Sequence, residues 1–107
     1  CNIEGAVIRS VLFPGVRVEK NASVKDSILF FDTTVGEGSV VCRTIADVDT
    51  RLGSNAEIGN PRGELSIIGR GTKVPPGIKI GGGVSVFPNL DEESFKKTVY
   101  TQGDIVE

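Results

Sequence analysis

The sequence predicts an all-β fold: a parallel β-helix of about five coils followed by a short C-terminal helix. Aliphatic residues recur with a spacing of 17 in two series, one of Val7, Val24, Val41 and Ile58 and the other of Val18, Val35 and Leu52. The small residues Ala22, Ser39 and Ala56 keep the same step. A fixed repeat length is typical of a solenoid, in which equivalent side chains stack above one another.

Each repeat divides further into units close to six residues long. Residues 18–23, 24–29 and 35–40 each begin with Val, and the first and third of these units carry a small residue, Ala22 and Ser39, four places later. Such a unit suits a very short strand and a bend, so three units make one triangular coil, with strands of successive coils about 4.8 Å apart. The alternative is a β-sandwich, but sandwiches show turn signals every 8 to 12 residues or so rather than a fixed coil length.

The composition agrees with a thin aliphatic core. The chain of 107 residues has 14 Gly, one Tyr and no Trp, which suits stacked tight turns. Its net charge of −2 gives no basic face large enough for nucleic acid or an anionic membrane. Cys1 and Cys42 fall in different columns of the repeat, so no disulfide is expected between them, which fits the cytoplasm.

Alternation along the short strands predicts which side chains face inward. Counting from Val7, the inward column of the next side would be Val11, Ile28 and Ile45, with Phe13 and Phe30 inward beyond it. Leu12 and Leu29 would then stack on the outside, with Ile8 and Phe31 nearby. An exposed apolar stripe marks a contact surface, so these four residues are predicted to lie against a second domain or subunit.

The coils are interrupted once and end before the C-terminus. Residues 60–65 contain Asn-Pro and Gly and predict a loop, after which the repeat resumes and closes at Gly81–Gly83. The β-helix is therefore expected over residues 1–83. Residues 84–107 are expected to form a cap, with a short helix over 89–97 that starts at Asn89 or Asp91 and a last strand over 98–101.

Two charged groups stand out on the predicted surface. Arg9, Asp26 and Arg43 keep the 17-residue step, so opposite charges should neighbour one another on successive coils. A second group surrounds the loop and the resumed coil. Its members, Arg51, Arg62, Arg70 and Lys73, predict a site for an effector anion, because guanidinium donors match phosphate geometry, while an ordinary solvated surface is the alternative.

Particular stretches carry a resemblance to a known family. The run Ser10-Val-Leu-Phe-Pro-Gly-Val-Arg-Val18 and the later Val74-Pro-Pro-Gly-Ile-Lys-Ile-Gly81 resemble the C-terminal domain of glucose-1-phosphate adenylyltransferases, also called ADP-glucose pyrophosphorylases. The resemblance covers about residues 1–83. Likeness to hexapeptide-repeat proteins implies that the coil is left-handed.

The resemblance implies that this chain is a regulatory and assembly module. In the family, an N-terminal catalytic domain joins glucose 1-phosphate to ATP with magnesium, giving ADP-glucose and pyrophosphate for glycogen or starch. That domain would lie upstream of Cys1 and would be the partner of this one, which helps to form tetramers and the pocket for phosphorylated effectors. No catalytic residue, cofactor or metal site is expected within residues 1–107 themselves.

Other assignments remain open at this point. Mannose-1-phosphate guanylyltransferases and subunits of translation-initiation exchange factors carry similar repeats, as would a non-catalytic paralogue. A self-standing β-helix that serves as a binding or scaffold module is another possibility. The hexapeptide acyltransferases rely on a histidine base, and this chain has no histidine.

Overall fold

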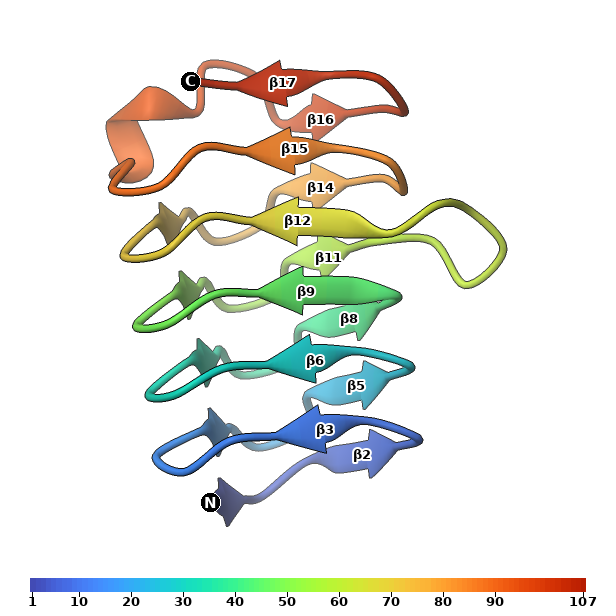
Figure 1. Cartoon of the computed structure of the whole chain (residues 1–107), viewed down its shortest axis with the longest axis vertical. Coiled ribbons are helices and arrows are strands. Elements are labelled where there is room, and N and C mark those ends of the chain that lie inside the picture. Colours follow the sequence, from blue (N-terminus) through green and yellow to red (C-terminus); the bar gives the residue numbers. More distant parts are fainter.

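Three parallel sheets form the sides of a triangular solenoid in the computed structural model, which describes all residues from Cys1 to Glu107 (Figure 1). Sheet A contains β1 (Asn2–Ile3), β4 (Arg17–Val18), β7 (Thr34–Val35), β10 (Arg51–Leu52) and β13 (Lys73–Val74). Sheet B contains β2 (Ala6–Ile8), β5 (Ser23–Lys25), β8 (Val40–Cys42), β11 (Glu57–Ile58), β14 (Lys79–Ile80) and β16 (Val99–Tyr100). Sheet C contains β3 (Val11–Leu12), β6 (Ile28–Leu29), β9 (Thr44–Ala46), β12 (Ser66–Ile68), β15 (Ser85–Val86) and β17 (Ile105–Val106).

The predicted parallel β-helix is therefore confirmed, with more turns than expected. Val7, Val24 and Val41 pair directly across β2, β5 and β8, as their 17-residue spacing requires. The coils amount to about six turns rather than five, because β16 and β17 begin a further one. In Figure 1 the front strands β3, β6 and β9 run to the left as the chain rises, which is the sense of a left-handed coil.

The strands are short because each side of the triangle ends at a residue in the left-handed backbone region. At two of the three corners this place is held by Gly, Asn or Asp, the residues that tolerate a positive φ best. One corner has Gly15, Asp32, Asp49, Gly71 and Asn89, and another has Asn21, Gly38, Asn55 and Gly77. The third corner, between sheets B and C, has Arg9, Asp26 and Arg43 in the first three coils, with φ of 47°, 51° and 44°, and Gly59, Gly83 and Gly103 in the later ones.

The core consists of aliphatic columns bordered by hydroxyl residues. Val18, Val35, Leu52 and Val74 stack behind sheet A, and Val24, Val41, Ile58 and Ile80 behind sheet B. Buried Ser and Thr side chains line the corners, where they bond to backbone groups. Thr72 Oγ1, for example, donates to the Phe87 carbonyl at 2.7 Å and accepts from the Leu90 N–H. No buried side-chain nitrogen or oxygen lacks a partner, so the corners are closed without an unsatisfied polar group.

The expected inward column of sheet C was wrong by one residue. Leu29 is fully buried at 0% exposure, while Val11 is 54% exposed and Ile28 and Ile45 are half-buried. The shift arises at the corner before this sheet. Two residues, Lys25 and left-handed Asp26, separate the inward residues Val24 and Ser27, whereas strict alternation along a strand would place only one there. Every inward side chain after this corner therefore lies one residue later than the alternation predicts.

The same one-residue shift places Phe13 and Phe30, which were expected in the core, at its edge. Phe13 and Phe30 are half-buried at the corner between sheets C and A, where their rings pack edge to face with centroids 4.9 Å apart. Val16 and Thr33, both 0% exposed, occupy the interior beside them. The phenylalanines therefore cover a corner from outside.

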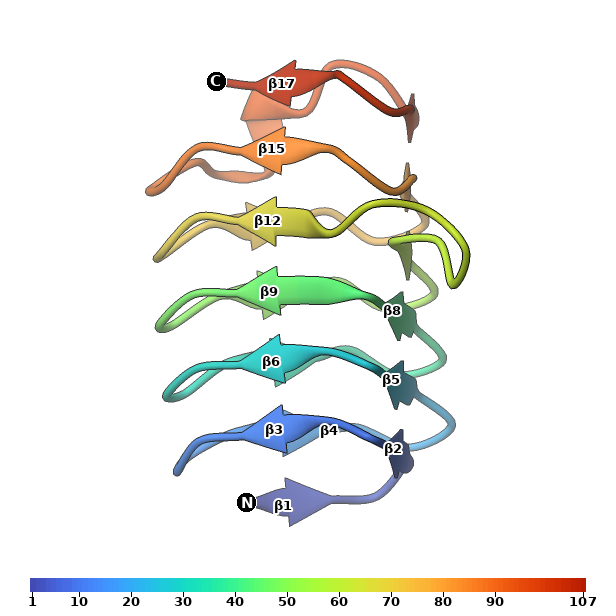
Figure 2. The same cartoon turned by 45° about the vertical axis from the view of Figure 1, so that its right-hand side comes forward.

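The inserted loop appears where it was expected. Residues 60–65 project from the corner between β11 and β12, as Figure 2 shows at the right of the solenoid. They lengthen the step from Arg51 to Lys73 to 22 residues without disturbing the pairing of β10 with β13. The expected strand near the C-terminus is present as β16, and the tail after it forms a further strand, β17.

The C-terminal region continues the solenoid rather than forming a separate helical cap. Sheets B and C run through residue 83 without a break, since β14 pairs with β16 and β15 with β17. Instead of a helix over residues 89–97 there is one 3-10 turn, η1 (Glu92–Ser94), with Asp91 at its N-cap. The Lys79 N–H donates to the Thr98 carbonyl, so the residues from Thr98 onward pair with β14 as a strand. The stretch that remains before Thr98 is too short for an isolated helix to be stable. Phe95 packs edge to face on Tyr100, with ring centroids 6.0 Å apart.

Truncation of Leu29 and of Val11 distinguishes the two inward assignments. We expect Leu29→Ala to lower the free energy of unfolding by about 3 kcal/mol, because it leaves a cavity in the core. Val11→Ala should cost less than about 0.5 kcal/mol, because that side chain is mostly in water. Urea unfolding followed by circular dichroism measures both, and equal losses would contradict the observed register.

Candidate functional site

An apolar column runs up the outside of sheet C. Val11, Ile28, Ile45 and Ile67, referred to below as the apolar face, lie directly above one another in the strand register. Ile67 is 50% exposed, and Leu65 beside it is also exposed. At the flanking corner the Phe13 ring contacts both Phe30 and Phe31, with the Phe13 and Phe31 centroids 5.1 Å apart. Water-exposed aliphatic side chains that form one continuous surface mark a binding face.

The four residues predicted to form a contact surface do not form one. Leu29 belongs to the core and Leu12, below it in the same column, is half-buried. Ile8 and Phe31 are exposed, but Ile8 lies on sheet B while Phe31 lies at the corner between sheets C and A. The one-residue shift moves the stripe to the neighbouring column of sheet C, and the charged residues at the preceding corner were the signal that could have indicated it.

The predicted anion residues separate into two places. Arg51 and Lys73 are neighbours on the outer surface of sheet A, and Arg70 lies in the turn just before β13. Arg17 occupies the same column two strands from Arg51, with Thr34 between them, and the sequence analysis did not include it. Arg17, Arg51 and Lys73 are all exposed and are referred to below as the basic column. Arg62 projects from the inserted loop at another corner, so it is not part of this group.

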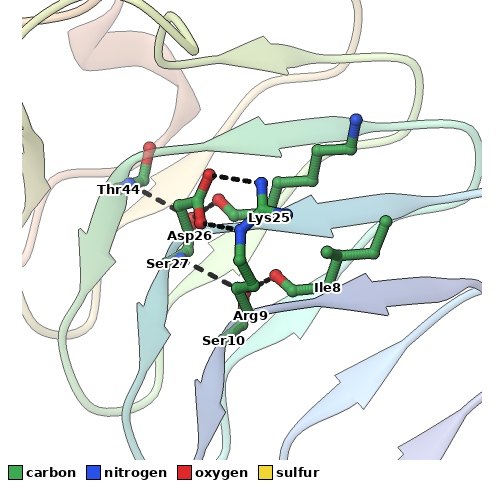
Figure 3. A network of polar contacts seen from close by, with 7 residues as sticks. All are labelled: Ile8, Arg9, Ser10, Lys25, Asp26, Ser27 and Thr44. Carbon is green, nitrogen blue, oxygen red and sulfur yellow. Dashed lines mark hydrogen bonds and ion pairs between the residues drawn. The ribbon is translucent and has the colours of Figure 1, made fainter.

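Of the expected alternating charges at the corner between sheets B and C, Arg9 and Asp26 form an ion pair, as Figure 3 shows. Arg9 Nε donates to Asp26 Oδ1 at 2.7 Å, and Arg9 Nη2 donates to Asp26 Oδ2 at 3.1 Å. Arg43 does not complete the ladder, because its Nε donates to the Gly63 carbonyl of the inserted loop at 2.9 Å. The hydrogen bond from Arg9 lowers the pKa of Asp26 and raises the pKa of Arg9 itself.

Hydroxyl groups behind this corner link the coils rather than forming a catalytic set (Figure 3). The N–H of Ser27 donates to Ser10 Oγ, and the N–H of Thr44 donates to Ser27 Oγ, both at 3.2 Å. Ser27 Oγ in turn donates to the Lys25 carbonyl at 2.8 Å. Each hydroxyl is thus committed to the backbone and is not available as a nucleophile.

Hollows occur at the two ends of the solenoid. One is bordered by Cys1, Asn2 and Arg17 and the other by Lys97, Tyr100 and Glu107. The chain has no group of three or more His, Cys, Asp and Glu residues placed to hold a metal ion. Both cysteines are free, and burial raises the pKa of the Cys42 thiol.

A family model described as GlmU-like, C-terminal hexapeptide matches residues 1–65. The chain belongs to this hexapeptide family. It is similar to the glucose-1-phosphate adenylyltransferase of Acetivibrio thermocellus, with 34% identity over 89% of this chain and 25% of that protein. It is also similar to the enzyme of the same name from Thermomicrobium roseum, with 38% identity over 77% of this chain and 22% of that protein. This hexapeptide-family chain therefore spans about a quarter of the length of these relatives.

Solved structures with a related fold also align with this member of the hexapeptide family. PerB from Caulobacter crescentus, in complex with CoA and GDP-perosamine, aligns with a TM-score of 0.47 and 21% identity. The alignment covers 94% of this chain and 50% of PerB. Within the chain itself, the helical content is too short and polar to supply a membrane-spanning helix.

The ion pair between Arg9 and Asp26 predicts a dependence of stability on pH. Because the folded state lowers the pKa of Asp26, the stabilisation is present above the unfolded pKa and is lost as pH falls through the folded pKa. We expect Asp26→Asn to destabilise the chain near neutral pH and to converge on the wild type in acid. Urea unfolding at several pH values tests this. In an Arg9→Met background the same substitution should lose its pH dependence, and an unchanged dependence would contradict the assignment.

Proposed function

We propose that this chain is the C-terminal β-helix domain of a cytoplasmic glucose-1-phosphate adenylyltransferase. Enzymes of that name transfer the adenylyl group of ATP to glucose 1-phosphate, giving ADP-glucose and pyrophosphate. The similarity to several such enzymes over most of this chain supports the proposal, as does the repeat itself. In this role the chain holds a separate catalytic domain and contributes to its regulation and assembly into a homo-oligomer, while the chemistry takes place elsewhere in the enzyme.

The observation that carries the proposal is the apolar face on sheet C. Aliphatic side chains of successive coils, exposed at Val11 and Ile67 and half-buried at Ile28 and Ile45, form one continuous column there. Burial of apolar area stabilises a contact by about 25 cal/mol per Å², so covering this column favours close packing of a second domain. Sheet A is polar on its outer surface, and Glu57 and Lys79 form a cross-strand ion pair at 3.5 Å on sheet B. Sheet C is thus the side best suited to the catalytic domain.

The basic column on sheet A supports a regulatory role. Arg51 and Lys73 lie on adjacent strands, which places their charges side by side, and neither is engaged in an ion pair. An arginine fork and a lysine ammonium can share the oxygens of one phosphate group. A phosphorylated effector bound here would also contact the catalytic domain if that domain extends over the neighbouring corner, which would connect effector binding to activity.

Charge placed on the apolar face tests the docking of the catalytic domain. In the full-length enzyme, Ile67→Glu should weaken the contact between the domains by about 2 kcal/mol and lower the midpoint of thermal unfolding. Val40→Glu, at a similarly exposed place on sheet B, is the matched control and should change little. Differential scanning calorimetry and adenylyltransferase assays report both effects. Equal behaviour of the two variants would overturn the assignment of sheet C.

Alanine substitutions on sheet A test the effector site. Arg51→Ala and Lys73→Ala should each raise the effector concentration that gives half-maximal activation about tenfold, which corresponds to about 1.4 kcal/mol for one lost charged contact. Arg62→Ala is the matched control, because that side chain lies in the inserted loop. Activity with glucose 1-phosphate and ATP without effector should be unchanged in all three. Unaltered activation in Arg51→Ala and Lys73→Ala would remove this site.

A further inference from the structure

The inserted loop, residues 60–65, lies in the fourth coil between β11 and β12. It closes on itself through two bonds, because the Gly63 N–H donates to the Asn60 carbonyl at 3.1 Å and the Arg62 N–H donates to Asn60 Oδ1 at 2.9 Å. None of its residues belongs to a strand or to the buried core. A segment with so few buried apolar contacts opens more easily than the sheets do, so the bonds that tie it to its neighbours decide its position.

Two neighbouring coils hold the loop in place. From the coil below, Arg43 Nε donates to the Gly63 carbonyl at 2.9 Å. From the coil above, the Gly83 N–H donates to the Glu64 carbonyl at 3.1 Å, and a Cβ at Gly82 would lie 2.9 Å from the same oxygen, which leaves no room for a side chain there. The contact above is thus made by backbone alone, while the contact below depends on one guanidinium.

Arg43 is an unusual residue for its position. Its φ of 44° lies in the region that most side chains avoid, and Gly83 and Gly103 hold the left-handed place at this corner in later coils. Arg9 and Asp26, at the same place in the first two coils, use their side chains in an ion pair. The side chain of Arg43 contacts the loop instead. An unfavourable backbone conformation that is kept where glycine serves in other coils indicates that the side chain has a role.

Cys42, next to Arg43, is enclosed although it faces outward. It follows inward Val41 in β8, and its register partner Lys25 is exposed, as is Ile8 in the strand below. The Cys42 side chain nevertheless belongs to a residue that is only 6% exposed. A cover is therefore present on the outer side of this strand, and Figure 1 shows the inserted loop turning down toward the level of β9, which follows β8 in the chain.

We propose that the inserted loop is a hinged flap, which the Arg43 guanidinium holds shut over Cys42. Opening breaks one side-chain and one backbone hydrogen bond, while the pairing of β9 with β12 stays in place. Leu65 ends the flap two residues before Ile67 of the apolar face, and both side chains are about half exposed. The edge of the apolar face therefore changes shape when the flap opens. The inference uses only residues of this chain and does not depend on the proposed enzyme.

Limited proteolysis with trypsin measures the opening, because the bond between Arg62 and Gly63 is a tryptic site within the flap. Arg43→Gly removes the guanidinium and relaxes the backbone, so we expect a folded chain in which cleavage after Arg62 is about tenfold faster, in proportion to the open population. Asp49→Gly is the matched control. It replaces another left-handed residue of the same coil, at a corner without the loop, and should leave the rate unchanged.

Three results of this experiment would overturn the flap. They are an unchanged rate in Arg43→Gly, an equal acceleration in Asp49→Gly, and an acceleration at Arg62 that only accompanies cleavage throughout the chain, which indicates global unfolding. Circular dichroism shows whether Arg43→Gly folds. If it does not, Arg43→Asn decides, because asparagine tolerates the same backbone conformation and lacks the guanidinium.

Alkylation with iodoacetamide provides a second measurement, with the two thiols resolved by peptide mass spectrometry. Cys1 is exposed and should react at the same rate in every variant, so it is the internal reference. Cys42 should react slowly in the wild type and about tenfold faster in Arg43→Gly, since the thiol is reached only through the open flap. A Cys42 that stays unreactive while cleavage after Arg62 accelerates would show that the loop does not cover the thiol, and the proposal would fail.

Discussion

One residue with a left-handed backbone at each corner of the triangle is the constraint on which the rest of this structure depends. A strand that turns after two or three residues can continue in a parallel stack only if the chain bends through a conformation that most residues avoid. Gly, Asn and Asp meet this need at two corners. Because the corners recur with the coil, the core columns recur with them.

The third corner shows what the sequence could predict and what it could not. The 17-residue spacing of Val7, Val24 and Val41 was sufficient to predict the coil, because a fixed spacing of like residues is what stacked coils of equal length require. Which residues of sheet C face inward was not predictable in the same way. Arg9, Asp26 and Arg43 occupy left-handed positions that carry no glycine signal, so alternation counted through them put Leu29 outside and Ile28 inside. The charged residues at this corner, followed by the small hydroxyl residues Ser27 and Thr44, were the indication that the count restarts.

The sequence predicted which surface residues are neighbours only where the strand register could be counted along the chain. Arg51 and Lys73 are 22 residues apart, and they become neighbours only because the loop between them leaves the sheet pairing intact. Arg62 is close to both in sequence but lies within that loop, at another corner of the triangle. Arg17 was missed because the basic residues were grouped by closeness in sequence, although two 17-residue steps connect it to Arg51 through Thr34. Residues on a solenoid should therefore be grouped by column rather than by distance along the chain.

The inserted loop shows that this architecture can change in length at a corner while its sheets stay in register. Ile58 still pairs with Val41, and Ile68 with Ala46, on either side of the added residues. The entropic cost of a longer loop rises slowly, by about 0.6 kcal/mol for each doubling. Residues Asn60 to Leu65 therefore mark a natural grafting point, where a peptide epitope or a reporter domain could be spliced in and displayed at a fixed height on a rigid rod.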